Sequence, residues 1–441
     1  MSVSASGYRG MLPGRTAVSA AVRTFTAGWV ESALSVAVFA TMCFVVLSAA
    51  PQAAEPDDGA YQASIVAMAD GHYLTLSEAQ AEALAWKLDD FPALIPTQWV
   101  ELTDGRYISE KDPGYPFLAT PFYAAGLIRW APLFYGALAC LGLFMGARRW
   151  LGSFGGLAAV GLYCSSGAAL AFAWRDFMPT FTDASLIAAG SGALLWAMLA
   201  GEAGPRRRNW IGLGGFLALE AATFVRYTDI AMLGCAIVAV IVASLAGAAH
   251  LPRRTLCTWL ASVAAFGAGV AVFDDLVYGG PLNSGYPPGQ ITFGLRALGP
   301  NLRMMPAHLM QAMPMLVLGL IALTWIVARW PRRHRMDGER GVIARCDLWV
   351  GLALGGSWFT IWSLYATYTG TTDPGNVAVQ DVRLYLPALG IASLLGAWLV
   401  TRVPGRRWRA AATSAAVIGM FVLGVSSFHA MYSALGVPLG G

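Results

Sequence analysis

The sequence has little charge and almost no lysine. Of its 441 residues, 12% are charged and 57% are hydrophobic, and the mean hydropathy is +0.57. Soluble domains have about 25% charged residues, so the composition excludes an ordinary soluble globular protein. Lysine occurs only at Lys87 and Lys111, and arginine supplies nearly all of the positive charge. We therefore predict an all-α polytopic membrane protein.

The sequence also lacks the usual signatures of metal, disulfide and nucleic-acid chemistry. None of the six cysteines has metal-ligand spacing, and they lie in or beside apolar segments, which favours small core residues over a disulfide framework. The net charge of +4 comes from short, scattered arginine clusters and gives no indication of nucleic-acid binding. No repeat with a period of 20–50 residues is evident.

Long apolar runs are abundant instead. About eleven segments approach the ~20 residues that a helix needs to cross a bilayer. The 50 glycines suit this class, because small residues let membrane helices approach closely. The predicted spans are 28–50, 131–147, 155–174, 183–200, 210–225, 229–249, 256–273, 308–328, 346–367, 384–401 and 410–430.

Arginine placement predicts the orientation of these spans. Alternate connectors contain arginine clusters, and the others hold most of the Asp, Tyr and Pro residues. By the positive-inside rule, the N-terminus is cytoplasmic and the C-terminus extracytoplasmic. We expect a cytoplasmic segment at 1–27, a transmembrane domain at 28–430 and an extracytoplasmic tail at 431–441. The alternative for the first span is a cleaved signal peptide at "LSAAPQAAEPDD", but its length favours a retained helix.

The largest extracytoplasmic loop is predicted at 51–130. Within it, 59–70 and 77–90 have helical character, and Ser77 is a plausible N-cap. Both are too short and polar to span a membrane, so we expect helices along the outer interface. The proline-broken "PGYPFLATPFYAAGL" is typical of an interfacial or re-entrant helix.

Acids and cations gather at the outer ends of the predicted spans. Asp57 and Asp58 directly follow the first span, and Glu110-Lys111 precedes a "DPGYP" turn. The remaining outer motifs are "WRDFMPTFTD", "VRYTD", "FDDLVYGGPLNSGYPPG" and "DVRLYLP". The topology predicts that all of them meet on one side of the membrane. The alternatives are a solvated helix cap for the aspartates, a solvated loop position for Lys111, snorkelling for the arginines and an interfacial belt for the aromatic residues.

These motifs resemble those of the GT-C superfamily of integral-membrane glycosyltransferases, in particular its protein-mannosyltransferase-like and lipid A aminoarabinose-transferase-like members. The matching elements are Asp57-Asp58-Gly-Ala-Tyr61, "EKDPGYPFLATPFY", Arg226-Tyr227-Thr228, "YGGPLNSGY" and "RLYLP". They occur in the family's order between about residues 28 and 400. One departure is Asp58, where the family usually has glutamate.

The resemblance implies an inverting transfer of a sugar from a polyprenyl-phosphate donor to an extracytoplasmic glycolipid, polysaccharide or protein. Such a reaction needs a base for the acceptor hydroxyl and cations for the leaving phosphate. Asp57 and Asp58 are the predicted catalytic residues, and Asp57 is the expected general base. The predicted phosphate-binding residues are Lys111, Arg383, Arg226 and Arg175. The supporting residues are Glu110, Tyr115, Asp176, Tyr278, Tyr286 and Tyr385.

No cofactor is certain from the sequence. A divalent cation is possible, with Asp58 and Glu110 as candidate ligands. The arginine bias and composition favour a bacterial inner membrane. Two other classes stay open, namely a multi-pass lipid or sugar transporter or flippase and a non-catalytic envelope scaffold. Transporters tend to hold ionisable groups near the membrane midplane, whereas here these groups crowd the outer ends.

Overall fold

The computed structural model describes most of the chain. The described residues are 15–49, 56–72, 74–89, 93, 95–199, 204–246, 251–286, 289–329, 339–371 and 379–434. Parts of the predicted terminal segments, at 1–14 and 435–441, lie outside them.

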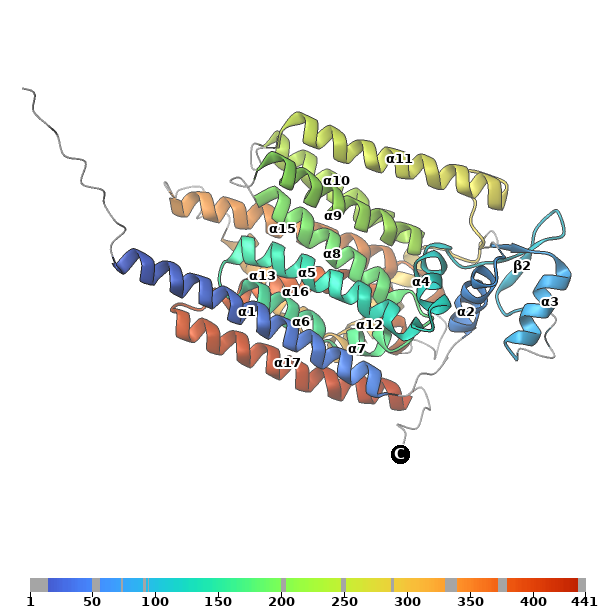
Figure 1. Cartoon of the computed structure of the whole chain (residues 1–441), viewed down its shortest axis with the longest axis horizontal. Helices are drawn as coiled ribbons and strands as arrows, with labels where there is room; N and C mark the ends of the chain where they lie inside the picture. The colour runs from blue at the N-terminus through green and yellow to red at the C-terminus, as the bar shows by residue number, and fades with distance from the viewer. Residues whose placement is uncertain are drawn as a thin grey trace, which may run out of the picture.

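Most of the described residues form helices that run side by side (Figure 1). The bundle helices are α1 (Arg15–Ser48), α5 (Ala131–Leu151), α6 (Gly155–Cys164), α7 (Gly167–Ala173), α8 (Thr180–Leu199), α9 (Pro205–Val225), α10 (Ile230–Leu245), α11 (Arg253–Tyr278), α12 (Leu298–Ala312), α13 (Leu316–Ala328), α15 (Glu339–Ala366), α16 (Leu389–Thr401) and α17 (Arg406–Ala434). Short 3₁₀ turns are η1 (Ile128–Trp130), η2 (Tyr227–Asp229), η3 (Leu295–Ala297), η4 (Thr369–Thr371) and η5 (Val379–Ala388).

The helical membrane architecture predicted from composition is confirmed. Seven helices in the described part of the chain are long and apolar enough to cross a membrane. Two further pairs would raise the number to nine if each bent pair is one span: α6 with α7, bent by 61°, and η3–α12 with α13, bent by 109°. The predicted spans at 210–225 and 346–367 correspond to α9 and α15, which lie in the same bundle (Figure 1). α1 as a whole begins at Arg15, and its candidate membrane span, Gly28–Ser48, begins at the predicted residue 28.

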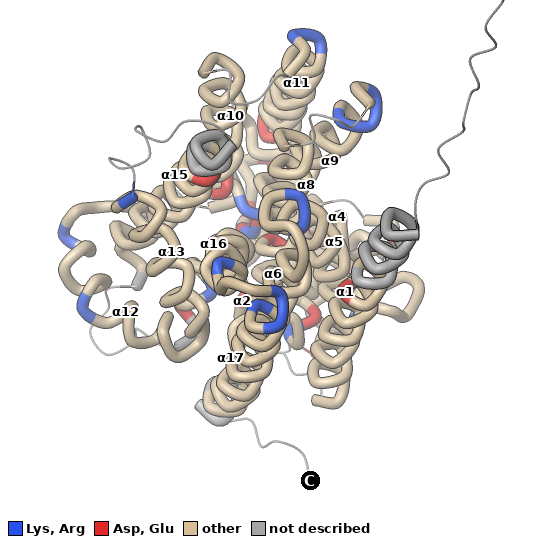
Figure 2. Tube along the Cα trace, turned by 90° about the vertical axis from the view of Figure 1, so that its left-hand side faces the viewer, with Lys and Arg blue, Asp and Glu red and all other residues tan. Residues whose placement is uncertain are grey.

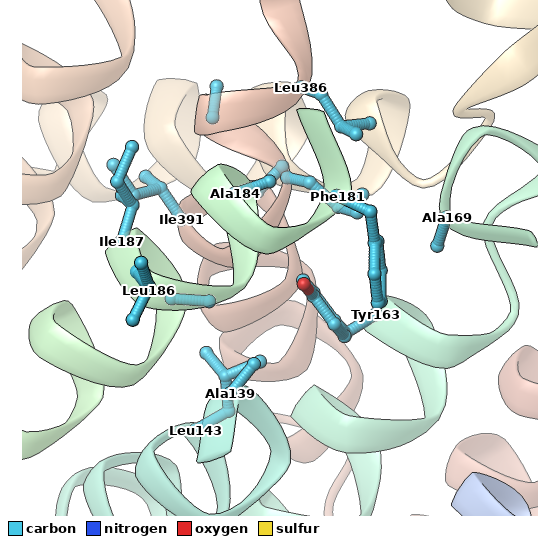
Figure 3. Close-up of a cluster of buried hydrophobic side chains, with 14 of the residues drawn as sticks. Ala139, Leu143, Tyr163, Ala169, Phe181, Ala184, Leu186, Ile187, Leu386 and Ile391 are labelled. Carbon is cyan, nitrogen blue, oxygen red and sulfur yellow. The ribbon is translucent and has the colours of Figure 1, made fainter. Parts of the chain in front are cut away.

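Glycine allows the central helices to approach closely. A Cβ on Gly142 of α5 would lie 2.5 Å from the Ala189 carbonyl oxygen of α8, and one on Gly192 of α8 would lie 2.2 Å from the Gly142 backbone. Neither position can hold a side chain without separating the two helices, as expected for small residues between membrane helices. Tyr163 and Phe181 pack against each other in the apolar core, with ring centroids 6.0 Å apart (Figure 3).

A small unit of short helices and strands lies at one end of the bundle (Figure 1). It contains α2 (Pro56–Ala69), α3 (Glu78–Lys87), α4 (Gly114–Ala124) and a three-stranded antiparallel sheet. The sheet has the order β1-β3-β2, with β1 (Thr75–Leu76), β2 (Trp99–Glu101) and β3 (Tyr107–Ser109). The helices correspond to the predicted interfacial segments, whereas the strands were not predicted.

The N-cap prediction for α3 is confirmed by a capping box. The Ser77 side chain accepts a hydrogen bond from Gln80 N, and Gln80 Oε1 accepts one from Ser77 N at 2.9 Å. These reciprocal bonds satisfy backbone donors that helix formation leaves without partners. α3 then packs Ala81 and Leu84 into a small apolar cluster with Leu76 and Trp99.

The opposite end of the bundle is rich in arginine. Figure 2 faces this end and shows basic segments at the starts of α9, α11 and α17. They contain Arg206–Arg208, Arg253–Arg254 and Arg406–Arg409. The acids and cations of the predicted site therefore lie at the other end from the main arginine clusters, as the loop alternation indicated.

Candidate functional site

The carboxylate of Asp57 bridges two cations from distant parts of the chain. Lys111 Nζ lies 3.0 Å from Asp57 Oδ1, and Arg383 Nη1 lies 2.9 Å from Oδ2. Gln98 Nε2 also donates to Oδ1 at 3.0 Å. Asp57 is in the first turn of α2, Lys111 follows β3, and Arg383 lies in η5 before α16. The fold thus brings together three residues that the sequence analysis selected.

The surroundings of Asp57 keep its carboxyl group ionised. Burial acts to raise the pKa, but the charges of Arg383 and Lys111 and the hydrogen bonds from Lys111 and Gln98 lower it to about 2. A carboxylate with so low a pKa is a weak proton acceptor. In this arrangement, Asp57 serves as a counterion for two cations.

Lys111 is enclosed rather than solvated. Its side chain is 8% exposed, whereas that of Lys87 is 49% exposed in a surface pair with Asp70. The interpretation of Lys111 as a solvated loop residue is therefore wrong. Lys111 Nζ also lies 3.0 Å from Glu110 Oε1 and 5.2 Å from the ring centroid of Tyr286. Such cation–π contacts stabilise a partly desolvated ammonium group.

The loop after α11 closes over this lysine through a glycine. A Cβ on Gly285 would lie 2.7 Å from Ser109 O and 2.8 Å from Glu110 O, so no larger residue fits there without moving β3 or the loop. The same loop region supplies Gln290, which donates to Glu110 Oε2 at 3.2 Å. Glu110 is thereby oriented toward Lys111.

Asp58 belongs to a separate, more deeply buried contact. Its carboxylate pairs with Arg175, and the side chains are 2% and 3% exposed. The Arg175 guanidinium also lies 5.9 Å from the Phe172 ring. This ion pair links α2 to the segment between α7 and α8, and it neutralises the predicted phosphate-binding Arg175.

Asp176 and Tyr115 extend this contact toward α4. The Tyr115 hydroxyl donates to the backbone carbonyl of Asp176, and the Tyr115 ring packs edge-on against Tyr61 at 6.0 Å. Burial raises the pKa of Asp176 to about 6, although Arg129, with Nε 3.9 Å from Oδ2, opposes the shift. Tyr115 and Asp176 therefore support the position of α2 and Arg175.

Arg226 lies behind Arg383. Its Nη1 donates to the carbonyl oxygen of Arg383 at 3.5 Å and lies 3.8 Å from Asp183 Oδ2. Asp183 is completely buried at the start of α8. Arg226 can thus position the backbone of η5 while adding positive charge beside the site.

Asp112, in the "DPGYP" motif, is a residue of the site that was not among the predicted site residues. It is 9% exposed, and its carboxylate accepts a hydrogen bond from Tyr227 N at 3.3 Å. Burial raises its pKa to about 7, although the Tyr227 N–H and the charges of Arg226 and Lys111 act in the opposite direction. Asp112 can therefore change its charge near neutral pH directly beside Lys111.

The three remaining predicted tyrosines have different surroundings. Tyr286 contacts Lys111, as described above. Tyr385 is 3% exposed, and its ring centroid lies 5.9 Å from Trp362 and 6.0 Å from Tyr365. Tyr278 packs edge-on against Phe273 at 6.2 Å. The contacts of Tyr385 are those of a core aromatic residue.

The donor groups do not fit a metal ion well. Within the described part of the chain, no group of three or more His, Cys, Asp or Glu side chains is arranged to hold one. The candidate ligands Asp58 and Glu110 instead face Arg175 and Lys111.

Sequence reasoning missed the two amides of the site, Gln98 and Gln290. Each orients a carboxylate, since Gln98 binds Asp57 and Gln290 binds Glu110. Neither lies in a charged motif, so no local signal marks them. Asp112 did carry a signal, because it directly follows Lys111.

No protein-family model matches the chain, and no curated relative matches it. Among solved structures, the chain is similar to the Archaeoglobus fulgidus oligosaccharyltransferase in its apo form, with a TM-score of 0.54 and 11% identity. That match covers 89% of this chain and 56% of the archaeal protein, so the chain spans little more than half of its length.

ArnT from Cupriavidus metallidurans is also similar, at 16% identity. Its apo structure gives a TM-score of 0.43 over 89% of this chain and 78% of ArnT. The structure bound to undecaprenyl phosphate gives 0.46 over 93% of this chain and 78% of ArnT. The similarity to the oligosaccharyltransferase shows a GT-C-like fold, which is the fold class predicted from the sequence.

Proposed function

We propose that the chain is an inverting membrane glycosyltransferase that uses a polyprenyl-phosphate-linked sugar. The observation that carries the proposal is the placement of Lys111 and Arg383 on either side of one carboxylate, that of Asp57. Two cations in a poorly hydrated site suit a phosphate group. The acceptor is an extracytoplasmic glycolipid, polysaccharide or protein, and the membrane is the bacterial inner membrane.

Lys111 and Arg383 stabilise the leaving phosphate in this proposal. As the bond between the anomeric carbon and the phosphate oxygen breaks, its electrons pass to the phosphate. Preorganised cations lower the energy of that developing charge more than that of the bound donor. Arg226 supports Arg383 through its backbone carbonyl. Arg175 acts indirectly, because its pairing with Asp58 fixes the start of α2.

Donor binding would also convert Asp57 from a counterion to a base. The donor phosphate competes with Asp57 for the same two cations, so their hold on the carboxylate weakens. Since those cations lower the pKa of Asp57 to about 2, their partial withdrawal raises it. The oxygen of the acceptor hydroxyl attacks the anomeric carbon from the face opposite the phosphate. Asp57 accepts the proton that this hydroxyl loses.

A long apolar cavity supports a lipid-linked donor. It has a volume of about 560 Å³ and lies between α8, α10 and α15. Its lining runs along α10 from Ala231, near the site, to Ala243, a distance of about 18 Å at the helical rise. The start of α10 and the end of α15 are joined by Thr228 and Tyr365, whose hydroxyls lie 2.6 Å apart. An apolar lining of this length suits part of a polyprenyl chain.

The proposal is tested with purified protein and a panel of polyprenyl-phosphate sugars. Mass spectrometry detects hydrolysis of the donor or transfer to an added acceptor, and D57N and K111Q serve as inactive controls. Turnover of one donor by the wild type, lost in both variants, supports the proposal. Exchange of labelled substrate across proteoliposomes without cleavage of any donor would instead identify a transporter.

A further inference from the structure

A second cavity, which has both polar and apolar lining residues, lies at the opposite end of the bundle from Asp57. Its volume is about 540 Å³, and it opens between α13, α15, α16 and α17. Arg402 directly follows α16, whereas Arg383 precedes it. The 13 residues of α16 are about 20 Å long, so the two sites lie near opposite ends of the bundle.

Arg402 is held in a fixed orientation in this cavity. Its Nη2 lies 2.6 Å from Asp347 Oδ2, and its guanidinium lies 4.8 Å from the Trp398 ring centroid. Asp347 accepts a second hydrogen bond from Trp150 Nε1 at 3.0 Å. Since a guanidinium has five N–H donors, the contact with Asp347 leaves donors that can face a ligand. The Arg402 side chain is 43% exposed, so a ligand can reach it.

A second arginine faces the same cavity. Arg329 lines it and lies 4.6 Å from the ring centroid of Trp325. Each of the two arginines therefore lies against the ring of a tryptophan that also lines the cavity, and these contacts help to hold the guanidinium groups in place.

The net charge of the lining residues suits a ligand with one negative charge. Arg329 and Arg402 supply two positive charges and Asp347 one negative charge, which leaves a net charge of +1. The rest of the lining is apolar and includes Leu399, Val400, Val403 and Ala412, together with the two tryptophan rings. A free inorganic anion would leave this apolar surface uncovered, whereas a lipid places an acyl chain against it.

We propose that this cavity binds the headgroup phosphate of an anionic phospholipid. The lipid belongs to the leaflet at the arginine-rich end of the bundle. Arg329 and Arg402 hold the phosphodiester, and the tryptophan rings flank it. Basic pockets between membrane helices suit such headgroups. The site is independent of the proposed glycosyltransferase activity, because its residues lie far from Asp57, Lys111 and Arg383.

The test is native mass spectrometry of the full-length protein titrated with phosphatidylglycerol or with phosphatidylcholine of the same acyl chains. Both lipids carry the phosphodiester, but the choline cation makes phosphatidylcholine net neutral. We expect phosphatidylglycerol to bind about fivefold more tightly, since one unit of charge near a membrane surface contributes about 1 kcal/mol. R329Q should weaken phosphatidylglycerol binding by about the same factor. R402Q combined with D347N removes the second cation without leaving a buried carboxylate unpaired.

R254Q is the matched control, because Arg254 is an exposed arginine at the same end of the bundle, outside the cavity. Its affinity for phosphatidylglycerol should equal that of the wild type. Equal binding of the two lipids, or an equal loss in R254Q and R329Q, would overturn the proposal. A parallel titration with inorganic phosphate distinguishes a lipid headgroup from a soluble anion. If inorganic phosphate displaces phosphatidylglycerol with an affinity similar to that of the lipid, the cavity is a site for a soluble anion. Thermal unfolding in detergent checks folding of each variant, and R329Q carries the test if the double variant unfolds.

Discussion

Arg383 Nη1 lies 2.9 Å from Asp57 Oδ2, and this contact joins the segment before α16 to the first turn of α2. The two residues lie more than 300 positions apart in the sequence, and their contact couples the small unit of short helices and strands to the helical bundle. Each also depends on other parts of the fold, since Arg226 donates to the Arg383 carbonyl and Gln98 donates to Asp57.

Replacing Lys111 with glutamine should lower kcat/KM by about 10²–10³, since a well-placed group that stabilises developing charge contributes that much. The chain offers a matched control, because K87Q removes the other lysine, which pairs with Asp70 on the surface. K87Q should retain wild-type turnover. Steady-state kinetics with the active donor measures both variants, and equal losses would contradict the role of Lys111.

Replacing Arg383 with lysine should restore only part of the activity that R383Q loses. Lysine keeps the charge but lacks the planar fork that binds two phosphate oxygens. We expect turnover in the order wild type, R383K, R383Q. Full activity of R383K would mean that charge alone is needed at this position.

D57N should separate turnover from donor binding. The loss of a general base lowers kcat by about 10²–10⁴. Donor affinity should be unchanged or higher, because the carboxylate no longer competes with the donor phosphate for Lys111 and Arg383. Steady-state kinetics of D57N measures the loss of kcat. The dissociation constant of a polyprenyl phosphate, measured for D57N and the wild type, tests the change in donor affinity. Weaker donor binding in D57N would contradict the competition.

Donor affinity should fall as the pH rises through about 7. Burial holds the pKa of Asp112 near 7, so it is mostly neutral below that pH and becomes anionic above it. A new negative charge beside Lys111 repels the donor phosphate, and the expected loss is about threefold to tenfold. Measuring the dissociation constant from pH 6 to pH 8 tests this. D112N should remove the pH dependence, whereas D104N, at an exposed position, should keep it.

Breaking the Asp58–Arg175 pair should act mainly on stability. Both side chains are almost completely buried, and removing one partner of such a pair costs about 3–5 kcal/mol. R175M should therefore lower the melting temperature in detergent. The double variant D58L/R175M should recover part of the loss, because neither charge then stays buried without its partner. A folded and stable D58N that lacks turnover would instead indicate a direct catalytic role for Asp58.

The sequence predicted the architecture well because membrane insertion leaves a strong mark on composition. Apolar runs located the bundle helices, and the Ser77 cap located the start of α3. The strands β1, β2 and β3 could not be predicted in this way. Each has only two or three residues, and their pairing connects positions up to about thirty residues apart.

The site was predicted in its charged members and missed in its neutral ones. Asp57, Lys111 and Arg383 are conspicuous in a chain with so few charges. Gln98 and Gln290 act only through the carboxylates that they orient, and that relation exists only in the folded chain. Only the folded chain shows the surroundings of the predicted supporting residue Tyr385, whose ring packs against Trp362 and Tyr365.

The sequence by itself determined that this chain forms a helical membrane protein, with the acids and cations of the candidate site at one end and the main arginine clusters at the other. That follows because charged groups are costly in lipid and so stay at helix ends. Tertiary structure alone decided which charges meet. Asp57 and Asp58 are neighbours in the chain, yet one faces Lys111 and Arg383 and the other Arg175, because successive side chains of a helix point about 100° apart.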